Sequence, residues 1–187
     1  MMLETFYPSS SEMQQCDLRT IAEGVSSFEL MNRAGVAVLD LCLADAFLTD
    51  SDSCCILCGA GNNGGDGLVI YRELLRRSFS CSLLIVASAK YSKDFLDQFE
   101  TLPSKESCFL VGEDPDCPLE LPVTHEIPEA VSVVFDCLLG TGQRGAPRGS
   151  VALALEMLAQ YKDKKPITCI AVDVPTGIDA DTGQVFV

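Results

Sequence analysis

The stretch Gly59–Gly67, GAGNNGGDG, follows the apolar run SCCILC and precedes the amphipathic run LVIYRELLRRS. An apolar run, a glycine-rich stretch and an amphipathic run in that order indicate a strand, a tight turn and a helix. Gly59, Gly61 and Gly64 have the spacing G-x-G-x-x-G, which leaves backbone N–H groups free at the start of a helix. The stretch therefore predicts an α/β fold whose first strand ends at an anion-binding loop.

Two common nucleotide-binding sites fit this stretch poorly. A dinucleotide-binding site has an acid about 20 residues further on, for the ribose, whereas the next apolar run ends LLIVASAK without one. A P-loop has a lysine at the position of Asp66. A plain turn with Asp66 as the N-cap of the helix is a further interpretation, which leaves the consecutive Asn62 and Asn63 unexplained.

Apolar runs alternate with amphipathic runs along the rest of the chain, and this predicts a doubly wound, mostly parallel sheet. Two N-terminal helices are expected after the capping serines Ser9 and Ser26. Residues 113–128, rich in proline and acid, are expected to form a surface loop. The predicted strands are 53–59, 81–88, 108–112, 131–140 and 166–174, and the helices between them are 66–78, 92–102 and 150–162.

The composition is that of a globular domain, with 187 residues, 48% of them hydrophobic. A net charge of −14 argues against a general nucleic-acid-binding protein, which needs a basic face. The apolar runs are too short to span a membrane, and the N-terminus lacks the features of a signal peptide. We therefore expect a cytoplasmic protein that contacts neither nucleic acid nor membrane.

The ten cysteines lie mostly within apolar runs, where cysteine behaves as a small hydrophobic residue. Cys54, Cys55 and Cys58 lack a second cysteine pair at zinc-site spacing, and the single histidine, His125, is distant in sequence. A cysteine nucleophile would need a basic partner, which His125 in a predicted loop supplies poorly. Zinc binding and thiol catalysis are both disfavoured.

Two aspartates interrupt apolar runs near the predicted carboxyl ends of strands, where ligands bind in such sheets. Asp136 lies in VVFDCLLGTGQRGAP and Asp173 in IAVDVPTGIDADTG. Asp136 could instead cap the following turn, and Asp173 could instead pair with a buried lysine or arginine. Asn63, Asp136 and Thr176 offer an amide oxygen, a carboxylate and a hydroxyl, which suit a hard cation of low charge. Asp173 is then a candidate acid/base.

Three motifs together resemble one known family. GNNGGDG, DCLLGTG and DVPTGIDADTG, preceded by SSSEMQQCD and SFELMNRAG, are similar to the motifs of the NAD(P)H-hydrate epimerase family, the YjeF N-terminal domain. The resemblance implies a Rossmann-like three-layer α/β/α sandwich with a mostly parallel sheet and N-terminal helices. It also implies epimerisation at C6 of hydrated NADH or NADPH, a repair reaction on damaged cofactors.

The resemblance assigns roles to individual residues. Asp173 becomes the catalytic acid/base as well as a substrate contact, and Asn63, Asp136 and Thr176 become the ligands of a potassium ion; the family often has serine at the position of Thr176. The residues expected to bind the substrate, besides Asp173, are Asn62, Asn63, Gly64, Gly65 and Asp66 in the first loop and Gly140, Thr141, Gly142, Gln143, Arg144, Gly145 and Ala146 in the second.

The family's domain usually continues for some tens of residues beyond this chain. We therefore expect residues 1–187 to be a single domain of this type, truncated at its C-terminus. The N-terminal part of a longer bifunctional chain is one form that such a truncated domain can take. An ATP- or ADP-dependent NAD(P)H-hydrate dehydratase is the expected functional partner or fused domain, and an unpaired sheet edge favours a homo-oligomer. The alternatives are a non-catalytic binding or scaffold module of the same fold, which tends to lose the carboxylates, and an ordinary dinucleotide oxidoreductase.

Overall fold

The strand before the glycine-rich stretch, β1 (Ser53–Cys58), lies inside a six-stranded sheet in the computed structural model, which describes residues 8–186. The strand order is β4-β3-β2-β1-β5-β6, and every neighbouring pair is parallel. The other strands are β2 (Ser80–Val86), β3 (Cys108–Val111), β4 (Val123–Thr124), β5 (Val133–Cys137) and β6 (Thr168–Ala171). The predicted α/β/α sandwich with a parallel sheet is confirmed.

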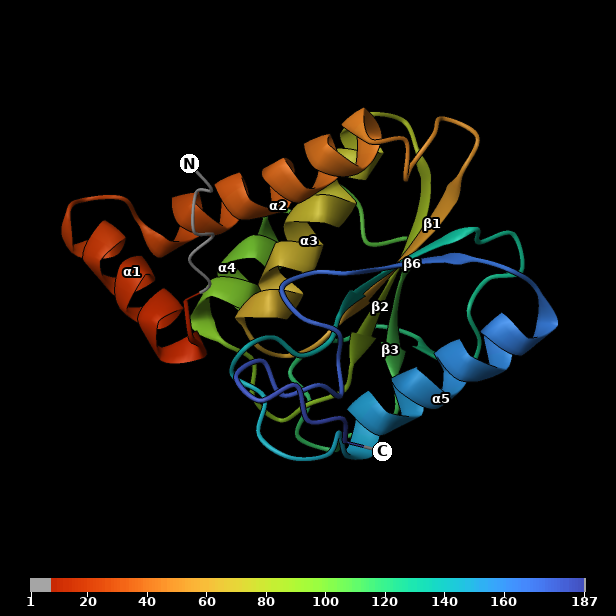
Figure 1. Cartoon of the computed structure of the whole chain (residues 1–187). Helices are drawn as coiled ribbons and strands as arrows, with labels where there is room; N and C mark the ends of the chain where they lie inside the picture. Colours follow the sequence, from red (N-terminus) through yellow and green to blue (C-terminus); the bar gives the residue numbers. More distant parts are fainter. Residues whose placement is uncertain (1–7, 187) are drawn as a thin grey trace, which may run out of the picture.

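Helices cover both faces of the sheet (Figure 1). On one face α3 (Asn62–Arg76) packs against β1, β2 and β5, and α2 (Ser27–Ala44) and α4 (Lys93–Glu100) pack against α3. On the other face α5 (Gly149–Lys164) packs against β2 and β3. Two apolar cores result, because residues alternate between the faces along each strand.

The first helix, α1 (Ser10–Ala22), has no buried residue and contacts α2 beyond the sheet. Its predicted capping box is present: Ser9 Oγ accepts from the Glu12 N–H, and Glu12 accepts from the Ser9 N–H at 2.8 Å. The Ser10 N–H donates to Asp181 Oδ1 at 2.7 Å, which ties the start of α1 to the C-terminal loop. The start of α1 and the loop around Asp181 therefore lie side by side.

Helix α3 begins earlier than the sequence predicted. Its first residue is Asn62 and its N-cap is Gly61, whose extended backbone provides no side-chain cap. The interpretation of Asp66 as the N-cap is therefore wrong, and Asp66 lies in the second turn of the helix. A Cβ on Gly64 would collide with the Gly59 carbonyl oxygen, so glycine at position 64 allows this helix start to approach β1 closely.

Two further details differ from the sequence prediction. The expected loop 113–128 contains β4, a two-residue strand paired with β3. Strand β6 ends at Ala171, so Asp173 follows the strand instead of interrupting it. Its φ of 69° places it in the left-handed region, which aspartate tolerates better than most residues.

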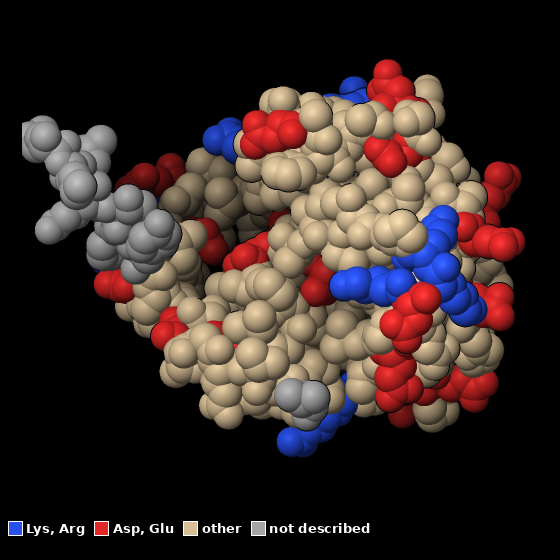
Figure 2. Space-filling view, turned by 45° about the vertical axis from the view of Figure 1, so that its right-hand side comes forward, with Lys and Arg blue, Asp and Glu red and all other residues tan. Residues whose placement is uncertain are grey.

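The surface reflects the acidic composition. Figure 2 shows acidic side chains spread over one face of the molecule and set into a hollow there, while Lys and Arg form fewer groups. Within residues 8–186, no helix is both long enough and apolar enough to cross a membrane.

Candidate active site at the carboxyl ends of β1, β5 and β6

Three loops meet where β1, β5 and β6 end side by side, because parallel neighbouring strands present their carboxyl ends at one edge of the sheet. The backbone of Leu139 joins these three loops. Its carbonyl oxygen accepts from Asn63 Nδ2 at 2.9 Å, and its N–H donates to Thr176 Oγ1 at 3.1 Å. The predicted convergence of the three motifs is therefore present, with a backbone group at its centre.

Asp136 organises the third loop. Its side chain is buried, and its Oδ1 accepts from Thr176 Oγ1 at 2.7 Å and from the Leu138 N–H at 3.2 Å. Its Oδ2 accepts from the Thr176 N–H at 2.9 Å. Asp136 thus fixes the turn after β6, and no basic residue of the described chain forms a salt bridge with it.

Asn63 has an oxygen without a partner. The residue is buried, and its Oδ1 accepts no hydrogen bond from residues 8–186. An unpartnered buried amide oxygen is costly unless water or a cation contacts it. Together with the oxygens of Asp136 and Thr176, it fits the donor set that a hard, low-charge cation requires.

Asp173 faces the second loop. Its Oδ2 accepts from the Thr141 N–H at 2.6 Å, and the carboxylate is exposed to solvent. A Cβ on Gly140 would collide with this same oxygen and would lie 3.3 Å from Asn63 Cβ. The side chains of Asp173 and Asn63 therefore both lie close to Gly140. Asp173 is therefore beside the proposed cation ligands and open to a ligand from solvent.

Asp66 lies on α3 one turn after Asn63. Its side chain is partly buried and accepts no hydrogen bond within residues 8–186. The pKa of Asp66 is raised to about 7, mainly by burial and then by the negative charges of Asp173 and Asp17. The site thus contains a second carboxyl group, influenced by Asp173 and by Asp17 on α1.

The second loop is held in place by its own side chains. Gln143 is buried, and its Oε1 accepts from the Gly177 N–H at 3.0 Å while its Nε2 donates to the Gly145 carbonyl oxygen at 3.2 Å. Arg144 Nη1 donates to the carbonyl oxygens of Gln143 and Thr141 at 2.8 and 3.3 Å. The amide of Gln143, predicted as a substrate contact, therefore links the second and third loops.

A cavity of about 360 Å³ adjoins the second loop at the start of α5. Arg144 and Arg148 line it, next to the helix N-terminus, which is a favourable arrangement for phosphate. Five of the predicted substrate residues contribute to its lining: Gly142, Gln143, Arg144, Gly145 and Ala146.

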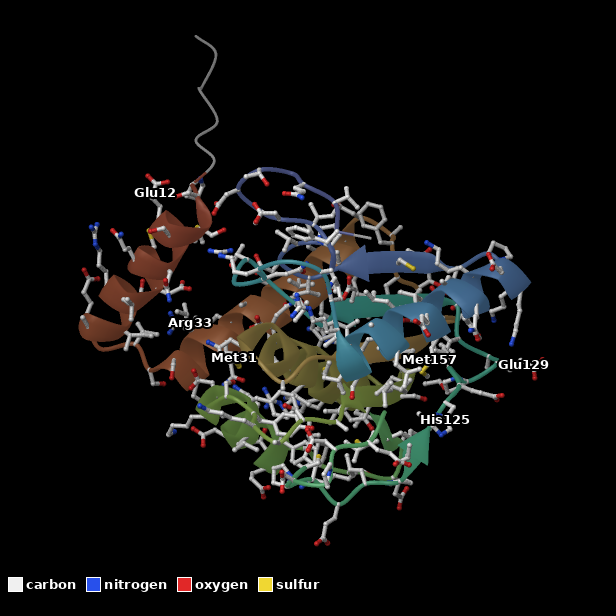
Figure 3. The ribbon with its side chains drawn as sticks, turned by 90° about the horizontal axis from the view of Figure 1, so that it is seen from below. Glu12, Met31, Arg33, His125, Glu129 and Met157 are labelled. Atoms are coloured by element: carbon white, nitrogen blue, oxygen red, sulfur yellow. The ribbon has the colours of Figure 1, made fainter. Side chains whose placement is uncertain are left out.

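A second cavity, of about 450 Å³, lies away from these loops. His125, Glu129 and Met157 line it (Figure 3), and none of the predicted site residues does.

Figure 3 also shows Met31 on α2. The sulfur of Met31 packs against Gly65, which is another close contact at the first loop.

The buried cysteines are poor candidates for nucleophilic chemistry. Burial raises the pKa of Cys54 to about 12 and holds the pKa of Cys58 and Cys137 well above the ordinary thiol value. These residues therefore remain thiols at neutral pH, and the attacking species of cysteine is the thiolate.

Sequence reasoning missed two parts of the site. Leu139 contributes only backbone groups, and its side chain gave no signal. Asp17 is distant in sequence and lies on α1, a helix without a buried residue. Only the position of α1 in the fold brings Asp17 near enough to affect Asp66. Asn62 of the predicted set is exposed, and its side chain makes no hydrogen bond to the described residues.

The fold and the site define a Rossmann-like α/β protein with a candidate ligand site where the strand order reverses between β1 and β5. The family model described as YjeF-related protein N-terminus matches residues 27–187, and the chain belongs to this family.

Named relatives agree with this membership, and a solved structure shares the fold. The chain is 35% identical over 179 residues to the NAD(P)H-hydrate epimerase of Leuconostoc mesenteroides, covering 95% of this chain and 72% of that protein. It is 34% identical over 161 residues to the bifunctional NAD(P)H-hydrate repair enzyme Nnr of Escherichia coli, covering 86% of this chain but only 28% of that protein. The crystal structure of yeast ynu0 shares the fold, with a TM-score of 0.74, 22% identity, and coverage of 97% of this chain and 75% of that one.

Proposed function

We propose that this chain is an NAD(P)H-hydrate epimerase, an isomerase that interconverts the R and S epimers at C6 of hydrated NADH and NADPH. The observation that carries the proposal is the exposed carboxylate of Asp173, held by the Thr141 N–H beside loops that meet at Leu139. The names of the relatives from Leuconostoc mesenteroides and Escherichia coli support the same reaction.

The chemistry suits these groups. The hydrated ring is a carbinolamine, so its C6 hydroxyl can leave and return on the other face when protons are supplied and removed. A carboxyl group beside the reacting carbon can perform both transfers, and Asp173 is the proposed catalytic residue. The first and second loops would bind the substrate, with Arg144 and the start of α5 facing its phosphates.

A potassium ion is the proposed cofactor. Asn63, Asp136 and Thr176 would hold it, because Asn63 Oδ1 has no hydrogen-bond partner within residues 8–186 and because the side chains of Asp136 and Thr176 accept from the successive N–H groups of Leu138 and Leu139. The ion would supply a fixed positive charge near the substrate. The chain's own residues position the loops through the Leu139 peptide and hold Asp173 beside Gly140.

An NAD(P)H-hydrate dehydratase is the proposed functional partner or fused domain, since one relative is a bifunctional repair enzyme. A homo-oligomer is proposed as well, because the apolar side chains of Leu18, Leu41 and Phe47 are about 60% exposed. The cytoplasm, where NADH and NADPH are abundant, is the proposed location.

The test supplies R-epimer hydrate to a dehydratase that consumes only the S epimer, with and without this protein. We expect the protein to accelerate conversion of the R epimer well beyond its spontaneous rate. A rate equal to the spontaneous one would contradict the proposal and would favour a non-catalytic binding module of the same fold.

A further inference from the structure

The site contains two carboxyl groups on different elements. Asp173 follows β6, and Asp66 belongs to α3, three residues after Asn63 and therefore on the same side of that helix. Asn63 reaches the second loop through Leu139, and Gly140 in that loop contacts Asp173. The side of α3 that carries Asp66 is thus directed at the space that Asp173 borders.

An epimerisation requires proton transfer on both faces of one carbon atom. A single carboxyl group on one side must act on both faces, whereas two groups on opposite walls serve one face each. We propose that Asp66 and Asp173 form a pair of catalytic residues that act on opposite faces of the hydrated ring. This inference rests on the proposed epimerase function and adds a second catalytic residue to it.

The proposed step balances without an oxidant or reductant. The carboxylic acid of Asp66 donates its proton to the C6 hydroxyl; the C–O bond breaks, the lone pair of the ring nitrogen forms a C=N bond, and water leaves. Water adds to C6 from the other face, loses a proton to the Asp173 carboxylate, and the C=N electron pair returns to nitrogen. Solvent carries the proton from Asp173 back to Asp66, and the reverse reaction uses the same groups in exchanged roles.

The surroundings of the two groups suit these different roles. Asp173 is exposed and accepts a hydrogen bond from the Thr141 N–H. Asp66 is partly buried, accepts no hydrogen bond within the described chain, and has its pKa raised to about 7 by burial, Asp173 and Asp17. The thiols of Cys58 and Cys137 are close enough to Asp66 to be affected by its charge, and they are neutral because burial raises their pKa. Environments that differ in this way typify acid–base pairs.

The experiment compares the whole chain with its Asp66→Asn and Asp66→Glu variants across a pH series in the coupled epimerase assay. We expect Asp66→Asn to lower kcat by about 100-fold or more with KM changed by less than about threefold. Asp66→Glu should recover part of the rate. The wild-type rate should fall above about pH 7, where Asp66 loses its proton, and the residual rate of Asp66→Asn should lack that fall. Asp163→Asn, at an exposed acid of α5, is the matched control and should keep the parent rate.

The outcomes separate this inference from the proposed function. A wild-type chain no faster than the spontaneous reaction would contradict the epimerase function itself. An active wild type with an equally active Asp66→Asn variant would overturn only the pair, as would a variant whose KM rises while kcat stays constant. Because the wild-type pH profile needs no substitution, an unchanged rate between pH 6 and pH 9 would also overturn it even if a variant failed to fold.

Discussion

Thr176 donates to both oxygens of Asp136, through its hydroxyl at 2.7 Å and its N–H at 2.9 Å. The same hydroxyl accepts from the Leu139 N–H at 3.1 Å, so one side chain joins the end of β5 to the two loops that follow β5 and β6. The loops that border Asp173 therefore depend on a buried polar network of few members, and such networks are costly when one member is lost.

Thr176→Val should destabilise the protein. The substitution keeps the shape but removes the hydroxyl, leaving the Leu139 N–H without its acceptor and Asp136 Oδ1 with one donor fewer. The expected loss is about 1–3 kcal/mol of unfolding free energy, measured by urea titration. Thr176→Ser restores the hydroxyl and is expected to stay within about 1 kcal/mol of the parent; equal stability of all three proteins would refute this role.

Gly140→Ala should impair the site, whereas Asp163→Asn, at an exposed acid of α5, should not. A Cβ at position 140 would collide with Asp173 Oδ2. We expect Gly140→Ala to displace the Asp173 carboxylate and to lower kcat of epimerisation by at least tenfold, because small displacements of a catalytic group are costly. Steady-state kinetics on both variants provides the measurement, and a parent-like rate for Gly140→Ala would contradict the placement of Asp173.

Asp173→Asn should abolish most activity without unfolding the chain. Asparagine tolerates the left-handed backbone at this position and still accepts from the Thr141 N–H, so the structure should be retained. Loss of the acid/base group should lower kcat by about 100-fold or more. Melting temperatures of the two proteins should agree to within about 2 °C; a large difference would mean that Asp173 is mainly structural.

Potassium should stabilise the chain if Asn63 provides a ligand. Replacing choline by potassium at constant ionic strength should raise the melting temperature of the wild type, because a ligand that binds only the folded state stabilises it. Asn63→Ala removes Oδ1, which has no hydrogen-bond partner within the described residues, and should abolish most of this rise, whereas the surface control Asp163→Asn should show the same rise as the wild type. A wild-type chain with the same melting temperature in both salts would count against the ion, whatever its activity.

The sequence was sufficient to predict most elements and the convergence of the site. Uninterrupted apolar runs marked the longer strands, and capping serines marked the starts of α1 and α2. The start of α3 was missed because glycine and asparagine are poor helix formers. In the fold, Gly64 and Gly65 provide the close packing of this turn against Gly59 and Met31, and tertiary contacts outweigh local preference there.

Other features depend on spatial placement alone. Asp66 looked like a helix cap because its sequence neighbours are glycines, and only the structure shows it partly buried and influenced by Asp17 from α1. Residues 113–128 gave no strand signal, because a two-residue strand is too short for any periodicity. Spatial relationships of this kind leave no local pattern in the sequence.

The carboxyl group of Asp66 should make the folded protein less stable as pH rises, and Asp66→Asn should remove this pH dependence. The carboxyl of Asp66 has a pKa of about 7 in the folded chain, because of burial first and then the charges of Asp173 and Asp17, against an ordinary value of 3.8. Between these pH values the folded chain holds a proton that the unfolded chain has lost. The free energy of unfolding contributed by this group therefore falls as pH rises from about 4 to about 7 and stays low above that.

A three-unit difference corresponds to ~4 kcal/mol, and partial contact with solvent reduces the expected effect to about 2 kcal/mol. Urea titrations at pH 4.5 and pH 8 should show Asp66→Asn gaining about this amount over the wild type at the higher pH and little at the lower one. Asp163→Asn should follow the wild type at both values. If Asp66→Asn were instead less stable than the wild type at pH 8, the ionised carboxylate would have a favourable partner in the fold, and its proposed role as the proton donor would be wrong.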